Sequence, residues 1–371
     1  MWRFKRYICL VGLLALLAAA LTGCGFSDDS VEELFTLPRM AEEYTGLTQE
    51  LEALITQGYE YASPTGRNIQ SVQMVDLDGD GQQEALAFFR MSSDEKPLKI
   101  FVFKIEGDSY ARYCTIESSG TAIDSVYYQD LNGDGRRELI VGWRISAEVQ
   151  TVAVYTVARE PVALMSSGYT RFTIQDLNGD GIPSLLVLRT DADSQPVAEF
   201  YGWQDEQMGV AYRCVLSSTM ASVNRGSLVS GRLDADTPAL YITGVDEQGM
   251  AATDILVFRQ DLGLVNLALS GSSTGVSNAV FPYRQLMPQD INGDGIIELP
   301  SPDTSWTAEQ TDGLVSWLCC NGDGQLSTVA KTYHSLSCGW YFTIPESWWD
   351  WSVETATTSI SNENQFSLAI N

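Results

Sequence analysis

The chain has 371 residues, too many for one small hydrophobic core, so its length predicts a large repeat domain or two domains. It carries 48 acidic residues against 22 Lys and Arg, and its formal net charge is −26. A surface this acidic repels nucleic-acid phosphates and anionic lipid headgroups and therefore disfavours both as partners, whereas cations are its natural counterions.

Residues 1–23 have the pattern of a signal peptide. Arg3, Lys5 and Arg6 precede an apolar run, residues 8–21, that is short for a membrane span. The sequence LTGC at 21–24 resembles the lipobox of bacterial lipoproteins, which implies cleavage before Cys24 and attachment of lipid to its thiol. We therefore expect an extracytoplasmic protein of the bacterial cell envelope, anchored through lipid on Cys24 alone and tethered by residues 24–38. Ordinary secretion with an incidental cysteine is the alternative.

A helical segment is expected at residues 39–67. Apolar residues recur there at helical spacing, and Gly58 is placed to end the helix as its C′ residue. The spaced residues are Met40, Tyr44, Leu47, Leu51, Leu54 and Ile55. We expect this apolar stripe to pack on the domain that follows, the alternative being recognition of a partner.

Residues 68–338 consist of repeated units rich in β-strand formers. Runs such as SVQMV and EALAFF flank an acidic loop, and LKIFVFKI and YARYCTI follow it, so one unit predicts four antiparallel strands. The loops start at Asp76, Asp130, Asp176, Arg232 and Asp290, with spacings of 54, 46, 56 and 58 residues. Four-stranded sheets at this period are typical of a β-propeller, because one blade cannot bury both faces alone. We therefore expect an all-β propeller of about five to seven blades.

The acidic loops have the oxygen-rich composition of a calcium site. In the first loop the carboxylates of Asp76, Asp78, Asp80 and Glu84 occupy positions 1, 3, 5 and 9, and the carbonyl of Gln82 is available at position 7. Hard oxygen ligands in a flexible loop suit Ca²⁺ better than Mg²⁺. An EF-hand or dockerin loop is excluded, because both need helical flanks and an EF-hand needs Glu at position 12.

The pattern D-x-[DN]-x-D-G-x-x-[DE] between two strands resembles the FG-GAP or VCBS repeats of integrin alpha-chain propellers and many bacterial surface proteins. The resemblance covers roughly residues 68–336 and implies calcium ligands at matching positions. These are Asp76, Asp78, Asp80, Gln82 and Glu84; Asp130, Asn132, Asp134, Arg136 and Glu138; Asp176, Asn178, Asp180 and Ile182; and Asp290, Asn292, Asp294, Ile296 and Glu298. In the third loop Ser184 replaces the acidic ninth residue, which should weaken that site. The loop at Arg232 is expected to hold no metal, and CNGDGQ at 320–325 is expected to form a plain hairpin turn.

A structural role for Ca²⁺ is expected, because nothing in the loops supplies the open coordination position or nearby base that metal catalysis needs. We expect a lipid-anchored binding module at the cell surface whose ligand is a protein, a peptide or a glycan. The competing hypothesis is a propeller enzyme, a hydrolase or lyase, that acts on envelope polysaccharide. A serine-hydrolase triad of Ser273, Asp290 or Asp303, and His334 follows a known chain order, but the surrounding sequence does not predict the strand-to-helix turn that it requires. A structural role is therefore favoured for His334.

The remaining cysteines and the C-terminus give weaker signals. Five scattered cysteines outside residues 1–24 form neither a zinc pattern nor a disulfide framework, although one bridge through Cys338 stays open. Residues 339–371 form an aromatic extension in which the sequence GWYFTIPESWWDW favours core packing over ligand binding. This extension is either an incomplete domain or a clasp on the propeller.

Overall fold

The computed structural model describes residues 44–66, 68–204, 206–249, 251–267, 286–302, 312–335 and 338–349, and the backbone of 353–360 and 363–370. The expected signal peptide, tether and lipidation site at Cys24 lie outside the described residues, as do Ser273 and Asp303. Within the described part of the chain, no helix is long and apolar enough to cross a membrane.

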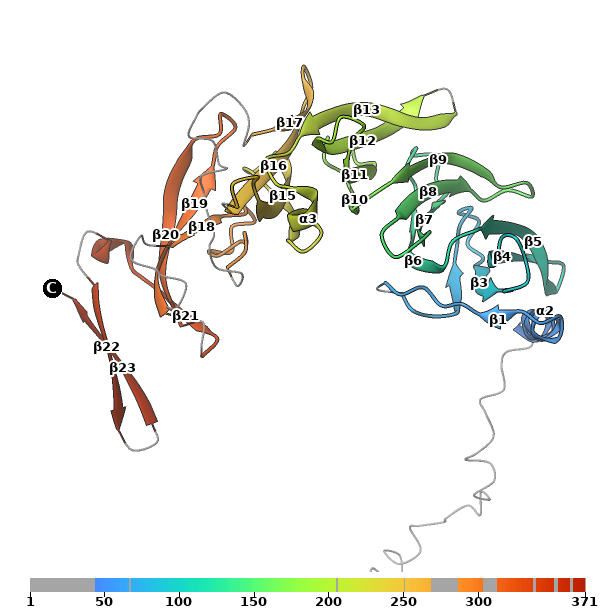
Figure 1. Cartoon of the computed structure of the whole chain (residues 1–371), viewed down its shortest axis with the longest axis horizontal. Helices are drawn as coiled ribbons and strands as arrows, with labels where there is room; N and C mark the ends of the chain where they lie inside the picture. The colour runs from blue at the N-terminus through green and yellow to red at the C-terminus, as the bar shows by residue number, and fades with distance from the viewer. Residues whose placement is uncertain are drawn as a thin grey trace, which may run out of the picture.

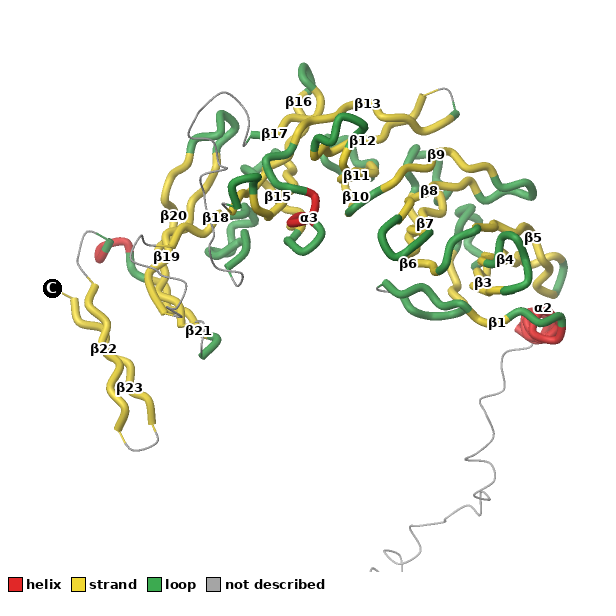
Figure 2. The backbone as a smooth tube through the Cα atoms, viewed as in Figure 1, coloured by secondary structure: helices red, strands yellow, loops and turns green. Residues whose placement is uncertain are grey.

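The described chain is mostly β. Helix is confined to α2 (Thr45–Thr56), the single turn α3 (Met220–Val223) and the 3₁₀ turn η4 (Glu346–Trp348), as Figure 2 shows. The short N-terminal helix is therefore confirmed. Gly58 follows its C-cap residue Gln57 with a φ of +96°, a left-handed conformation that suits glycine and matches the predicted C′ position.

Five antiparallel sheets hold most of the remaining strands, and within each sheet the main strands lie in sequence order. Sheet 1 contains β2 (Val72–Val75), β3 (Glu84–Arg90), β4 (Leu98–Glu106) and β5 (Ser109–Ser118), with β1 (Glu60–Tyr61) also pairing with β3. Sheet 2 contains β6 (Ala122–Gln129), β7 (Glu138–Arg144), β8 (Gln150–Thr156) and β9 (Val162–Gly168). Sheet 3 contains β10 (Arg171–Gln175), β11 (Ser184–Thr190), β12 (Pro196–Gln204) and β13 (Gln207–Val215).

The last two sheets differ in how they begin. Sheet 4 contains β14 (Leu228–Arg232), β15 (Pro238–Val245), β16 (Ala251–Arg259) and β17 (Gly263–Asn266), and sheet 5 contains β18 (Leu299–Pro302), β19 (Asp312–Cys320), β20 (Leu326–Ser335) and β21 (Trp340–Thr343). In sheet 5 a single bridge between Gln289 and Glu298 stands where the other sheets have their first strand. Strands β18 to β20 thus correspond to the second to fourth strands elsewhere, and β21 adds an outer strand.

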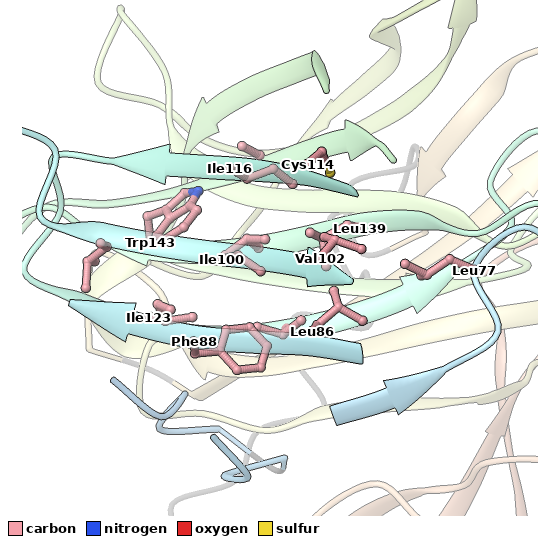
Figure 3. Close-up of a cluster of buried hydrophobic side chains, with 14 residues drawn as sticks. Leu77, Leu86, Phe88, Ile100, Val102, Cys114, Ile116, Ile123, Leu139 and Trp143 are labelled. Atoms are coloured by element: carbon pink, nitrogen blue, oxygen red, sulfur yellow. The ribbon is translucent and has the colours of Figure 1, made fainter. Parts of the chain in front are cut away.

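The five sheets follow one another around an arc, and the first and fifth do not meet in Figure 1. Consecutive sheets pack face to face, because side chains alternate between the two faces of each strand. In β3, Leu86 and Phe88 face sheet 2, while Ala85, Ala87 and Phe89 face α2. Figure 3 shows the first of these interfaces, where Phe88 and Ile100 of sheet 1 meet Leu139 and Trp143 of sheet 2.

Burial on both faces explains the apolar runs in the second and third strands. Side chains such as Phe88 and Leu139 are fully buried, and burial of one such side chain contributes about 1.5–3 kcal/mol. Helix α2 covers the outer face of sheet 1 with Leu47 and Leu54, which pack near Phe89 and Phe103. The first sheet is therefore covered on both sides.

The expected aromatic extension, residues 339–371, contains one strand of sheet 5 and a separate hairpin. Strand β21 lies within the segment expected as an extension, yet it pairs with β20 and so belongs to sheet 5. Its residues Trp340, Tyr341 and Phe342 are 38%, 53% and 44% exposed, so these aromatics do not fill a core as expected, because β21 is an edge strand. A separate hairpin follows, β22 (Val353–Ile360) with β23 (Glu363–Ile370).

Candidate metal loops

Five acidic loops occupy equivalent places in the sheets. Loops 1 to 4 (residues 76–84, 130–138, 176–184 and 232–240) lead from the first to the second strand of sheets 1 to 4, and loop 5 (residues 290–298) leads from the Gln289 bridge into β18. Their flanks are strands, so the structure agrees with the exclusion of an EF-hand.

The aspartate at position 1 shapes each of loops 1, 2, 3 and 5. In loop 1, Oδ1 of Asp76 accepts a hydrogen bond from the amide of Gly79 at 2.8 Å, and Oδ2 accepts one from Gly81 at 3.1 Å. Both glycines have a positive φ, +75° and +88°, which lets the chain curl around the carboxylate. The same pair of bonds recurs at Asp130, Asp176 and Asp290, with lengths between 2.6 and 2.9 Å.

The glutamate at position 9 is buried beneath the loop. Glu84, Glu138 and Glu298 are 3%, 4% and 1% exposed. One carboxylate oxygen of each accepts a bond from the amide at position 2, at 2.7, 2.9 and 3.0 Å. Burial raises the pKa of Glu138 to about 7, with further contributions from Asp134 and Asp130. Burial likewise raises the pKa of Glu84 and of Glu298, because the charged form has lost its water.

Loop 1 brings three carboxylates together around one point. Ligand oxygens of Asp76, Asp78 and Glu84 lie within 4.8 Å of one another. The ammonium of Lys104, on β4, lies 2.5 Å from Asp78 Oδ2 and 3.7 Å from Glu84 Oε1. The proximity of Lys104 to this loop could not be predicted from the sequence, because only the pairing of β3 with β4 places it there.

Loops 2 and 5 hold their acids without such a cation. Within the part of the chain that the structure describes, neither Glu138 nor Glu298 has a basic side chain within ion-pair distance. In loop 5 the second oxygen of Glu298 accepts a bond from the side-chain amide of Asn292, at 3.3 Å. Each buried carboxylate therefore lacks a positive counterpart in the described structure.

Loop 3 has Ser184 at position 9 but retains the rest of the pattern. Asn178 donates from Nδ2 to Asp180 Oδ2 at 2.7 Å, as the asparagine at position 3 also does in loops 2 and 5. Oδ1 of Asn178 is buried and has no hydrogen-bond partner. In loops 2 and 5 the corresponding oxygen accepts a bond from the amide at position 5. A buried carbonyl oxygen without a donor is costly, and a bound cation would satisfy it.

In loop 4 and in the turn at 321–325, hydrogen bonds within the protein hold the backbone in its turn. In loop 4 the guanidinium of Arg232 donates to the carbonyl of Ala235 at 2.8 Å, and Asp234 accepts bonds from the amides of Asp236 and Thr237. The 321–325 turn joins β19 to β20 through a bond from Asn321 N to Gln325 O at 2.9 Å, which confirms a hairpin turn.

Neighbouring loops contact one another. The amide of Arg137 in loop 2 donates to the carbonyl of Leu77 in loop 1 at 2.7 Å, and the amide of Ile297 in loop 5 donates to Arg232 in loop 4 at 3.0 Å. A cavity of about 720 Å³ opens beside loops 1 and 2, lined among others by Asp78, Lys104, Asp134, Arg136 and Trp203. Loop 1 thus contacts loop 2 and loop 4 contacts loop 5, and the cavity lies beside the first of these pairs.

Of the residues considered for a hydrolase triad, the structure describes Asp290 and His334, and no hydrogen bond or ion pair within the described residues joins these two. His334 is 5% exposed, stacks on Tyr341 and lies 2.8 Å from Thr332 Oγ1 through Nε2. Burial lowers its pKa to about 4. Both oxygens of Asp290 accept bonds from amides of loop 5. His334 therefore has the surroundings of a buried structural histidine.

Comparisons with known proteins add little to this description. No protein-family description matches the chain, and no curated protein does. Among solved structures, a hypothetical protein from Leishmania major aligns over 75% of this chain and 97% of its own, at 11% identity and with a TM-score of 0.25. A likeness this weak carries no argument about fold or function.

Proposed function

We propose that the chain is a calcium-stabilised β-propeller of the FG-GAP or VCBS type. It is lipid-anchored outside the cell through Cys24 and acts by presenting a binding face to a surface protein or glycan. The observation that carries the calcium part is the pair of buried glutamates, Glu138 and Glu298, which have no basic partner among the described residues. A carboxylate taken out of water is costly unless a cation compensates it.

The donor sets of the loops fit a hard divalent cation. Carboxylate, amide and main-chain carbonyl oxygens are the ligands that Ca²⁺ takes in flexible loops. The ion would be held at positions 1, 3, 5 and 9 by side chains and at position 7 by the main chain, with position 9 missing in loop 3. Its contribution would be charge neutralisation, which fixes the path of each loop between its two strands.

The stacking of four-stranded sheets around an arc supports a propeller-type architecture, because each sheet needs a neighbour on each face to bury both. The lipid anchor rests on the sequence LTGC at residues 21–24. The binding role rests on the resemblance of the acidic loops to the FG-GAP or VCBS repeats of surface proteins. The ligand is taken to be a protein or a glycan, because the acidic surface disfavours nucleic acid.

Thermal melting of the purified full-length protein tests the calcium sites. Addition of Ca²⁺ should raise the melting temperature and a chelator should lower it, because a ligand that binds only the folded state stabilises it by mass action. Asp134→Asn in loop 2 should weaken this response, whereas Asp236→Asn, at the same position of loop 4, should not. A melting temperature indifferent to Ca²⁺ and chelator would refute the sites.

Glycan-array binding and pull-down from cell-surface extracts test the binding role. Retention of a defined glycan or surface protein by the calcium-loaded protein would support it. Turnover of envelope polysaccharide by the purified protein would favour an enzyme instead.

A further inference from the structure

Loop 1 differs from the other loops in having a cation built into the neighbouring strand. Lys104 lies on β4, one residue beyond the pair formed by Ala85 and Phe103, and so stands across from Glu84. The equivalent places across from Glu138 and Glu298 are one residue beyond the Leu139–Tyr155 and Leu299–Leu318 pairs, and they hold Thr156 and Cys319. Only the first of these three places carries a positive charge.

The Lys104 ammonium contacts two acids of loop 1 and one aromatic ring. It lies 2.5 Å from Asp78 Oδ2 and 3.7 Å from Glu84 Oε1, which are the acids of positions 3 and 9. The ring of Tyr113 lies 4.6 Å from the same nitrogen, as in a cation–π contact, and the lysine side chain is 17% exposed. The amine therefore sits largely out of water, against two of the oxygens that would bind a metal.

We infer that Lys104 is the resident counter-cation of loop 1, so that loop 1 keeps its shape without calcium and binds it more weakly than loops 2 and 5. This inference rests on the proposed calcium function, and it distinguishes loop 1 from loops 2 and 5. A divalent ion and an ammonium that share two carboxylates repel each other, and the ammonium must move away before the ion can take both oxygens. Loops 2 and 5 have no such competitor among the described residues.

The test replaces the charge while keeping most of the side-chain stem, with Lys104→Met. In the metal-free protein this variant should be less stable than wild type in urea unfolding, because Glu84 loses its positive partner. In a calorimetric titration with Ca²⁺, the affinity of loop 1 for Ca²⁺ should be about ten-fold or more higher in this variant than in wild type. Adding Asp80→Asn, which keeps the Oδ1 acceptor for the amide of Gln82, should abolish the gain and so assign it to loop 1.

Lys99→Met is the matched control. Lys99 lies on the same strand and pairs with Asp94 at 2.8 Å and Glu117 at 2.5 Å, away from the acids of loop 1. The Lys99→Met variant should be less stable than wild type, but its Ca²⁺ titration should match that of wild type. The inference is overturned if Lys104→Met binds Ca²⁺ no more tightly than wild type, or if its metal-free stability equals that of wild type. If neither protein binds Ca²⁺, the proposed function fails, and the metal-free comparison alone decides whether Lys104 neutralises the loop.

Discussion

The contact between loops 1 and 2 can be measured with a matched pair of glycine substitutions. Gly79 and Gly81 both have positive φ, and both donate their amides to Asp76. A Cβ at Gly79 would lie 2.7 Å from the carbonyl oxygen of Gly135 in loop 2, whereas a Cβ at Gly81 would meet nothing within 4 Å. Alanine therefore adds backbone strain at both positions but a clash with the neighbouring loop only at Gly79.

The magnitudes follow from these two terms. The left-handed conformation should cost each alanine about 1–2 kcal/mol. The backbone carbonyl of Gly135 cannot rotate away as a side chain would, so Gly79→Ala should lose a further 1–3 kcal/mol or so. Urea unfolding of both variants in the presence of chelator measures the difference without a contribution from metal. Equal losses for the two variants would refute the loop–loop packing.

Two further predictions concern buried titratable groups. Burial lowers the pKa of His334 from an ordinary 6.5 to about 4, so its contribution to the free energy of unfolding is present above pH 6.5 and is lost as the pH falls towards 4. The variant His334→Phe should remove this pH dependence, which amounts to about 3 kcal/mol. A stability profile that the substitution leaves unchanged would contradict a buried neutral imidazole. Because the pKa of Glu138 is raised to about 7, the stability of the metal-free protein falls as the pH rises from 4.5 to 7. The variant Glu138→Gln should therefore stabilise the metal-free protein above pH 7 and weaken its response to Ca²⁺. The control Glu160→Gln, at an exposed residue, should do neither.

Much of the strand pattern could be predicted from local sequence. The runs LKIFVFKI and YARYCTI became β4 and β5, and the glycine of the EGDS turn between them, Gly107, has a φ of +69°. The acidic loops could be predicted in the same way, because the alternating acids and the two glycines that build one turn all lie within nine residues of the chain. These features depend on neighbours in the chain, which a sequence displays directly.

Features that depend on pairing between distant segments could not be predicted. Lys104 lies twenty residues beyond Glu84, and only the register of β3 with β4 brings the two together. The bond from Arg137 to Leu77 joins two sheets. The placement of β21 depended on whether β20 had a free edge, which residue types alone do not reveal. Whether such sheets close into a ring would likewise depend on how the first and last of them meet in space.

Helix α2 has a consequence for how the stack of sheets can end. It covers the face of sheet 1 that points away from sheet 2, with Leu47 and Leu54 near Phe89 and Phe103. In a ring of blades, that face would receive the final blade. In such a ring, a closing blade would contact helix α2 rather than the sheet itself.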